Sequence, residues 1–396
     1  MLTISNKGRL MPESPIRKLV PYAEKAKKNG VKVFHLNIGQ PDIETPFSAI
    51  EAVKNSNIKV LAYSKSEGDY ELRNKICDYY SNINIKIDES EVIVTSGASE
   101  ALLFTIGSIM DPGDEIIIPE PFYANYNGFS VANGVNIVPI FSSIDNNFEL
   151  PKIQEFENLI SSNTKAILIC NPNNPTGYVY SYDEVKTLVE IVKKHNLFLI
   201  ADEVYREFTY DNVSHTSILQ FDDIKQHAIV IDSVSKRYSM CGARIGCIIS
   251  KNSEFISTAM KFAQARLSPP TLAQIASTAA MDTGEDYFNK VINEYNDRRK
   301  TLVEGLNEIP GVKVSEPKGA FYCVVELPVN NSEHFAKWLL EEYSLNQETI
   351  MVAPAAGFYS SPNIGKNQVR IAYVLNQNDL ESCINILKNG LIEYLK

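Results

Sequence analysis

The chain has 396 residues, long enough for a large domain and a smaller one, each with its own hydrophobic core. Hydrophobic residues make up 44% and charged residues 22%, which is typical of globular proteins, and the formal net charge is -10. Because a nucleic-acid-binding surface usually carries an excess of Lys and Arg, this acidic balance disfavours nucleic acid as a partner.

The first 30 residues mix Lys, Asn, Pro and Glu and hold no apolar core of a secretory signal. No apolar run is long enough to cross a bilayer, so no membrane association is expected. The six cysteines form no CxxC pair and the five histidines are scattered, so neither a disulfide framework nor a metal site is predicted. These features favour a cytoplasmic protein with reduced thiols.

Short apolar runs alternate with helical patterns through the middle of the chain. The runs lie at residues 115–118, 165–169, 198–201 and 229–231. Because they show no polar alternation, they predict strands of a sheet that is buried on both faces. Between the second and third runs, Ser181 and Glu184 form a capping-box pattern, which predicts a helix to about His195. Strand, helix and strand in this order indicate an α/β fold with a mostly parallel sheet.

From about Tyr295 the pattern changes to a charged helical stretch and then to strand-like segments at 321–326, 350–352 and 369–374. We therefore expect two domains. Residues 46–290 form a large domain, a mostly parallel sheet with helices on both faces, and residues 291–396 form a small α+β domain. Residues 1–45 form an N-terminal arm and part of the small domain.

Polar segments follow three of the predicted strands, at residues 171–177, 202–205 and 233–236. In open α/β sheets, ligands bind outside the carboxyl ends of the strands. The three loops are therefore expected to face one site.

Lys236 lies in the segment Ser233-Val234-Ser235-Lys236, and Arg244 follows shortly after. Hydroxyl donors and a guanidinium suit a phosphate dianion, and a lysine beside such a site suits a cofactor held as a Schiff base. For the lysine alone, a solvated surface position is the simpler interpretation.

Three further segments each allow a functional and a structural interpretation. Asp202 follows a predicted strand and can either keep a pyridine nitrogen protonated or cap a helix. Residues 171–177 can be a polar loop with amide donors or only a turn. Residues 95–102 read as a strand end, a turn at Gly97 and a helix start, whose amides can bind a phosphate or belong to an ordinary capped helix.

Taken together, these segments resemble the fold-type-I, class I/II aminotransferases, close to the bacterial aspartate/aromatic branch. The most specific motif is Ser-x-Ser-Lys followed by Gly-x-Arg-Ile-Gly, at residues 233–246. Upstream lie Asn-Pro-x-Asn-Pro-Thr-Gly at 171–177 and Asp-Glu-x-Tyr at 202–205. The resemblance implies a homodimer with shared active sites and pyridoxal 5'-phosphate as cofactor. It also implies amino transfer from an L-amino acid, aspartate first, to a 2-oxo acid such as 2-oxoglutarate; aromatic or broad specificity comes next.

The resemblance also implies a role for individual residues. Lys236 would form the Schiff base and move the substrate Cα proton, and Asp202 would pair with the pyridine nitrogen. Asn174 and Tyr205 would bind the phenolic oxygen, while Tyr123 would stack on the ring or, alternatively, be a core or interface aromatic. The phosphate would be held by the turn at Gly97, the amides of Ala98 and Ser99, Ser233, Ser235 and Arg244, with Tyr63 reaching it from the other subunit.

Substrate recognition is assigned in the same way. Arg370 would bind the α-carboxylate, with the backbone of Gly39 beside it. Arg266 is a candidate, by region only, for reading a distal carboxylate. A helix-end arginine paired with a neighbouring carboxylate is the alternative.

Two other functions stay open at the level of sequence. One is a different reaction on the same scaffold, such as C–S β-elimination, decarboxylation or cyclopropane formation. The other is a non-catalytic binding module, for which an attached DNA-binding domain would be expected before about residue 40, where there is no room. A nicotinamide GxGxxG motif is absent, and Gly365-Lys366 is followed by Asn367, which excludes a P-loop there.

Overall fold

The centre of the protein, a computed structural model that describes residues 2–396, is a seven-stranded sheet with the order β2-β8-β7-β6-β5-β3-β4. The strands are β2 (Val92–Thr95), β3 (Glu115–Glu120), β4 (Asn136–Phe141), β5 (Thr164–Cys170), β6 (Phe198–Asp202), β7 (Ala228–Ser233) and β8 (Gly246–Ile249). Strand β8 runs antiparallel to β2 and β7, and the other pairs are parallel. The predicted runs lie within β3, β5, β6 and β7, so the mostly parallel sheet is confirmed.

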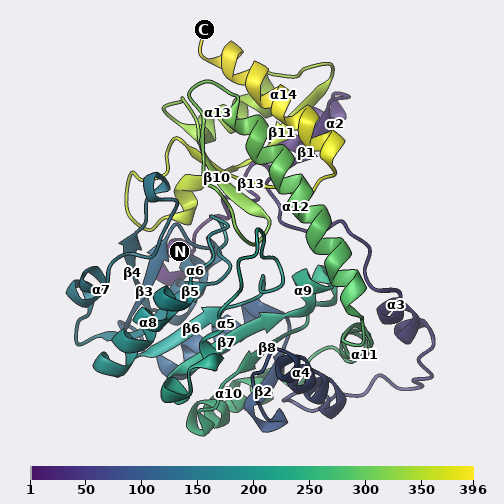
Figure 1. Ribbon diagram of the computed structural model, residues 1–396, viewed down its shortest axis with the longest axis vertical. Coiled ribbons are helices and arrows are strands. Elements are labelled where there is room, and N and C mark those ends of the chain that lie inside the picture. Colours follow the sequence, from purple (N-terminus) through teal and green to yellow (C-terminus); the bar gives the residue numbers. More distant parts are fainter. Residues whose placement is uncertain (1) are drawn as a thin grey trace.

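Helices cover both faces of this sheet (Figure 1). One face packs on α5 (Ala98–Ile109), α6 (Asn125–Asn133) and α10 (Ser253–Arg266), and the other on α4 (Tyr70–Asn82), α7 (Ile153–Leu159), α8 (Tyr182–His195) and α11 (Thr271–Ala280). Alternate residues of one strand enter opposite cores: Ile200 of β6 packs with α5, whereas Leu199 and Ala201 pack with α8. This two-sided burial explains why the strands are apolar without polar alternation.

Helix α8 forms where the capping box predicts it. The Ser181 hydroxyl accepts the Glu184 amide, and the Glu184 carboxylate accepts the Ser181 amide at 2.8 Å. The helix buries Val185, Leu188 and Val192 and ends at Asn196, which adopts a left-handed conformation. Its end carries the chain directly into β6 and so fixes where Asp202 emerges.

The C-terminal third of the chain builds a second core together with the N-terminal segment. Strands β9 (Lys313–Val314), β10 (Tyr322–Glu326), β12 (Ala353–Pro354) and β13 (Gln368–Ala372) form an antiparallel sheet, and β1 (Lys32–His35) pairs in parallel with β11 (Glu348–Met351). Helices α2 (Val20–Lys28), α13 (Ser332–Glu341) and α14 (Gln377–Tyr394) pack in the same core. The long helix α12 (Glu285–Asn307) runs from α11 up to α14 (Figure 1). The domain limits at residues 45 and 290 stay a prediction.

The remaining elements are short. They are α1 (Asn6–Leu10), α3 (Phe47–Lys54), α9 (Val234–Arg237) and the 3-10 turns η1 (Glu89–Glu91), η2 (Ile144–Asn146), η3 (Ile218–Gln220), η4 (Asp222–Ile224), η5 (Cys241–Ala243) and η6 (Ala355–Phe358). Across residues 2–396, every helix is too short or too polar to traverse a bilayer.

Candidate active site

A cavity of about 670 Å³ lies beyond the carboxyl ends of β5, β6 and β7, and it brings the three predicted loops together. Of the predicted site residues, those lining it are Gly39, Ala98, Ser99, Tyr123, Asn174, Asp202, Tyr205, Ser233, Ser235, Lys236, Arg244 and Arg370. Gly97 forms the turn immediately before Ala98, the first residue of α5. The convergence of loops at one edge of the sheet follows from parallel strands that end at the same level.

Lys236 projects into this cavity from α9, one short turn after β7. Its Nζ donates to the carbonyl oxygen of Gly39 at 2.8 Å and lies 3.7 Å from Cys241 Sγ. The rings of Tyr205 and Phe321 are each 5.8 Å from the amine. Within residues 2–396, Lys236 forms no ion pair. Its amine is half-enclosed and faces the cavity, so it does not have the solvated position of an ordinary surface lysine.

Gly39 is held between Lys236 and Tyr322. A Cβ at Gly39 would lie 1.7 Å from Tyr322 Oη, so no other residue fits there without moving the tyrosine. Tyr322 Oη in turn lies 2.9 Å from Tyr205 Oη. Tyr322 of β10 is a cavity residue that the sequence does not reveal, because an aromatic residue in a predicted strand has the pattern of a core residue.

Asp202 is buried at the end of β6 and faces the cavity. Tyr126 Oη of α6 donates to its carboxylate at 2.8 Å, and the Val204 amide lies 3.4 Å from the other oxygen. Burial raises the pKa of Asp202 to about 6, against the lowering effect of these hydrogen bonds. The residues that directly follow Asp202 form a turn and not an α-helix, which excludes the helix-cap interpretation. Tyr126 is a second residue that sequence reasoning missed.

The start of α5 and Arg244 form an anion-binding corner. The first-turn amides of Ala98 and Ser99 have no acceptor within their helix, and the helix dipole is positive there. Gly97 has φ 82°, and a Cβ on it would lie 2.3 Å from Arg244 Nη2, so glycine is required for the guanidinium to lie against the turn. Arg244 itself donates to the Cys241 and Ser96 carbonyls at 3.1 and 3.4 Å.

The two serines before Lys236 have different surroundings. The Ser233 hydroxyl donates to the Ile245 carbonyl at 2.7 Å and accepts the Ser235 amide at 3.1 Å, so it caps α9. The hydroxyl proton of Ser233 is therefore already donated to a carbonyl of the protein. In this geometry Ser233 shapes the turn that begins α9. The Ser235 hydroxyl, 2.8 Å from Ser233 Oγ, faces the same cavity as Arg244.

Arg370 of β13 is a buried guanidinium without a carboxylate partner in residues 2–396. Nη1 donates to Asn174 Oδ1 at 3.0 Å, Nη2 donates to the Asn37 carbonyl, and Nε has no partner. The guanidinium carbon lies 4.5 Å from the Tyr322 ring centre. Burial lowers the pKa of Arg370, which is the expected cost of an isolated buried cation. Such a group is a receptor for an anion.

Arg266 is not a cavity residue, and the hypothesis that it reads a distal carboxylate is wrong. It ends α10, where Nη1 donates to Glu100 at 2.9 Å and Nη2 donates to the Ser66 and Val94 carbonyls. Its donors thus hold α10 to the start of α5. This is the alternative that the sequence left open, a helix-end arginine paired with a neighbouring carboxylate. Tyr63 also lies outside the cavity and is 80% exposed, so its proposed action in a second subunit is not tested within one chain.

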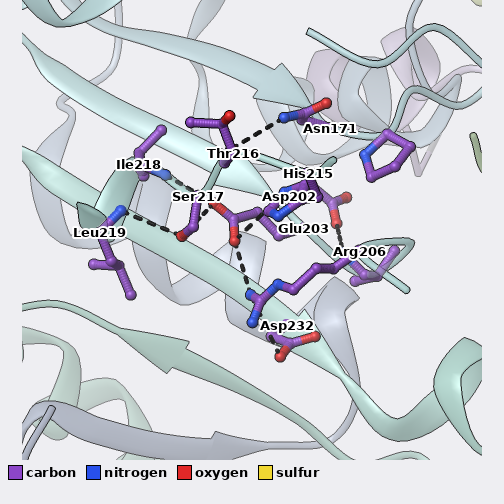
Figure 2. Close-up of polar contacts among 12 residues, drawn as sticks. Asn171, Asp202, Glu203, Arg206, His215, Thr216, Ser217, Ile218, Leu219 and Asp232 are labelled. Atoms are coloured by element: carbon purple, nitrogen blue, oxygen red, sulfur yellow. Dashed lines mark hydrogen bonds and ion pairs between the residues drawn. The ribbon is translucent and has the colours of Figure 1, made fainter. Parts of the chain in front are cut away.

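A cluster of buried charges lies next to the cavity and supports its loops (Figure 2). Glu203 receives hydrogen bonds from Arg206 at 2.7 Å, Ser217 at 2.9 Å and the Ile218 amide at 3.1 Å. Burial raises the pKa of Glu203 to about 7, although Arg206 lowers it. Asp232 pairs with Arg237 at 2.6 Å. We call Glu203, Arg206, Glu207, Asp232 and Arg237 the ion network.

Asp232 is held in its charged form by two arginines. Burial alone would raise its pKa, but Arg237 and Arg206 lower it below the usual value. Arg237 also bonds Glu207 at 2.7 Å, so its guanidinium joins two carboxylates. Because Glu203 and Arg237 directly follow Asp202 and Lys236 in the chain, the ion network fixes the backbone from which both cavity residues project.

Known proteins of similar sequence and structure are aminotransferases. A family model for aminotransferases of class I and II matches residues 31–387. An aspartate aminotransferase of Pyrococcus horikoshii is 32% identical over 98% of this chain and 97% of its own length. A single mutant of Thermus thermophilus aspartate aminotransferase has a TM-score of 0.90 at 26% identity, over 98% of this chain and 100% of that one. An alanine aminotransferase from Pyrococcus furiosus has a TM-score of 0.90 at 28% identity, over 99% and 100%.

Proposed function

Because the chain belongs to the class I and II aminotransferases, we propose that it moves an amino group from an L-amino acid, with aspartate favoured, to a 2-oxo acid such as 2-oxoglutarate. Aminotransferases of this kind depend on pyridoxal 5'-phosphate. The observation that carries the proposal is the pairing, in one cavity, of the Lys236 amine with the buried and partly unsatisfied guanidinium of Arg370. A cytoplasmic location is part of the same proposal.

The lining residues fit this cofactor. The cavity volume lies in the usual range for small-molecule sites. The amides of Ala98 and Ser99, the Ser235 hydroxyl and Arg244 supply donors for a phosphate dianion. Asp202 is a buried carboxylate that forms no ion pair within residues 2–396, which is the complement of a protonated pyridine nitrogen. The donor set and the acceptor are both present in one cavity, so no part of the site conflicts with the group.

When bound, pyridoxal 5'-phosphate supplies an electron sink for the charge left at the substrate Cα as its proton departs. Lys236 would hold the cofactor carbonyl through its Nζ, and a substrate amine that takes that place would leave the Lys236 amine free. The free Nζ would then remove the Cα proton and return it at a neighbouring carbon. One lysine therefore supplies both covalent binding and acid–base chemistry.

The remaining cavity residues position charge. Asp202 would keep the ring nitrogen protonated, and Tyr126 orients the carboxylate through its 2.8 Å hydrogen bond. Asn174 Oδ1 is occupied by Arg370, which leaves its Nδ2 to donate to the phenolic oxygen together with Tyr205. Tyr123 lines the cavity for stacking on the ring. Arg370 binds the α-carboxylate, and the Gly39 backbone lies beside the lysine.

We further infer that the enzyme is a homodimer with shared active sites. Val60, Leu61 and Tyr63 are 76%, 64% and 80% exposed in the single chain, and an exposed apolar stretch of this kind supports burial against a partner. Mixing Lys236→Ala and Tyr63→Ala chains tests the sharing. If Tyr63 serves the other subunit, some mixed dimers hold one intact site and activity rises above that of either parent.

The substrate proposal is tested with a panel of amino donors. Aspartate, glutamate, alanine, phenylalanine and leucine are each offered with 2-oxoglutarate, oxaloacetate and pyruvate, and the new amino acid is quantified. The proposal expects amino transfer that requires a 2-oxo acid, with aspartate and 2-oxoglutarate as the best pair. A preference for aromatic donors, or equal use of many donors, would replace aspartate. Release of ammonia and pyruvate from cysteine derivatives without an oxo acid would identify a C–S β-lyase.

A further inference from the structure

Four cationic side chains line the cavity, and three of them have tasks in the proposed function: Lys236, Arg244 and Arg370. The fourth is Arg17, which the sequence did not single out. Its side chain is exposed at the cavity wall, and its guanidinium forms no hydrogen bond or ion pair within residues 2–396. Because Asp202 is the one carboxylate among the lining residues and is bonded to Tyr126, nothing in the described chain neutralises Arg17 there.

The backbone around Arg17 is tied to the proposed substrate anchor. Asn37 Nδ2 donates to the Ile16 carbonyl at 2.7 Å, and the Asn37 carbonyl accepts Arg370 Nη2. The Ile16 side chain packs in the same apolar cluster as Phe358, whose ring centre lies 5.0 Å from the Arg370 guanidinium carbon. A single residue therefore joins the peptide that carries Arg17 to the guanidinium of Arg370.

The two arginines act on one region of the cavity. Burial raises the pKa of Tyr123, and the positive charges of Arg370 and Arg17 both oppose that increase. Arg17, Tyr123 and Arg370 all line the same cavity, so both positive charges act on the space beside this tyrosine. Asn125 Nδ2 also donates to that hydroxyl, at 2.8 Å. A ligand that fills the space beside Tyr123 meets two positive groups.

We propose that Arg17 binds the distal carboxylate of dicarboxylic substrates while Arg370 binds the α-carboxylate. The proposal rests on the function proposed above and names the substrate class of the same site. It takes over the task for which the sequence had suggested Arg266. Two guanidinium groups in one cavity match the two carboxylates of a four- or five-carbon amino diacid or oxo diacid.

The exposure of Arg17 has a consequence for selectivity. When a neutral amino acid binds, the guanidinium can stay in solvent, so no buried charge is left unpaired and the neutral substrate is not rejected strongly. A buried arginine in this position would reject it. We therefore expect a preference for dicarboxylic substrates over neutral ones and not an absolute requirement.

Arg17→Gln and Arg17→Lys test the proposal, with Arg9→Gln as the matched control. Arg9 is an exposed arginine in the same N-terminal segment and does not line the cavity. Arg17→Gln is expected to lower kcat/KM for aspartate, glutamate and 2-oxoglutarate by about 10- to 100-fold. The values for alanine and pyruvate should stay unchanged, and Arg17→Lys should fall between wild type and Arg17→Gln. Arg9→Gln should match wild type for all substrates.

Binding of unreactive acids gives a readout that does not depend on turnover. Calorimetric titration with succinate and with propanoate should show that Arg17→Gln weakens succinate selectively. Equal losses for dicarboxylic and neutral compounds, or no loss, would overturn the role of Arg17. So would a wild-type enzyme that transfers amino groups only between neutral compounds. Failure of all amino transfer by the wild type would instead reject the proposed function, and the succinate titration would still decide the role of Arg17.

Discussion

Two sets of charged side chains lie side by side in this protein, and they differ in whether the chain supplies their counter-ions. In the ion network, each carboxylate has an arginine within 2.7 Å: Glu203 has Arg206 (Figure 2), while Asp232 and Glu207 share Arg237. In the cavity, Asp202, Lys236 and Arg370 form no ion pairs within residues 2–396, and Arg370 Nε has no partner at all. Charges that the chain itself neutralises hold the structure, and charges that it leaves without a counter-ion are available to ligands.

The two sets come from neighbouring positions in the chain. Asp202 faces the cavity and Glu203 the ion network; Lys236 faces the cavity and Arg237 the ion network. Successive side chains point to opposite sides where β6 ends, and they are turned by about 100° from each other in α9, so adjacent residues can serve both sets. Substitutions at these adjacent positions should therefore separate catalysis from stability.

The largest effect is expected for Lys236→Ala. The substitution removes the group proposed to hold the cofactor and move the proton, so turnover should fall by at least ~10⁴-fold. Because Lys236 forms no ion pair, its removal leaves no carboxylate without a counter-ion. The free energy of unfolding should therefore stay close to that of wild type. Steady-state kinetics and denaturant unfolding measure the two quantities. Substantial residual turnover would remove Lys236 from the mechanism.

Asp232→Asn should instead lower the free energy of unfolding. Loss of this carboxylate leaves Arg237 with one fewer counter-ion in a buried position, which is expected to reduce the free energy of unfolding by about 3–5 kcal/mol. Urea unfolding of the cofactor-free protein measures the change, with the exposed Asp222→Asn as control. If Asp232→Asn were as stable as wild type, the ion network would not have the structural role assigned to it.

Asp202→Asn should lower turnover by about 10²- to 10³-fold, because a neutral amide no longer keeps the ring nitrogen protonated. The stability of the cofactor-free protein should respond to pH in the opposite sense to that of an ordinary paired aspartate. Burial raises the pKa of Asp202 from 3.8 to about 6, so its contribution to stability is complete below pH 3.8 and lost as the pH rises through about 6. The difference in stability between wild type and Asp202→Asn should change over that range and be flat above it. A wild-type turnover in Asp202→Asn would assign this residue a structural role only.

Arg370→Lys should have the smallest of these effects. A point charge replaces a two-pronged donor, so KM should increase for every amino donor by a similar factor of about 10 to 100. Donors with and without a second carboxylate are compared directly. A selective loss for aspartate would show that Arg370 reads the side chain and not the shared α-carboxylate.

The sequence predicted those features that depend on local signals. The apolar runs predicted β3, β5, β6 and β7 of the large sheet, the Ser181 capping box predicted α8, and the polar strand ends predicted the position of the cavity. It did not predict which partner each charged side chain would have. The partner of Arg266 is Glu100, 166 residues earlier, and Arg17 reaches the cavity because Asn37 holds its neighbour. Such pairings depend on tertiary packing, so a residue type and its neighbours in sequence do not reveal them.

Chemical trapping of the cofactor tests the central claim most directly. Purified protein is saturated with pyridoxal 5'-phosphate, reduced with borohydride, digested and mapped by mass spectrometry. The unpaired amine in the cavity predicts a single pyridoxyl group on Lys236 and none in the Lys236→Ala variant. A label on any other lysine, or no stable label in the wild type, would contradict the assignment of the cavity as the cofactor site.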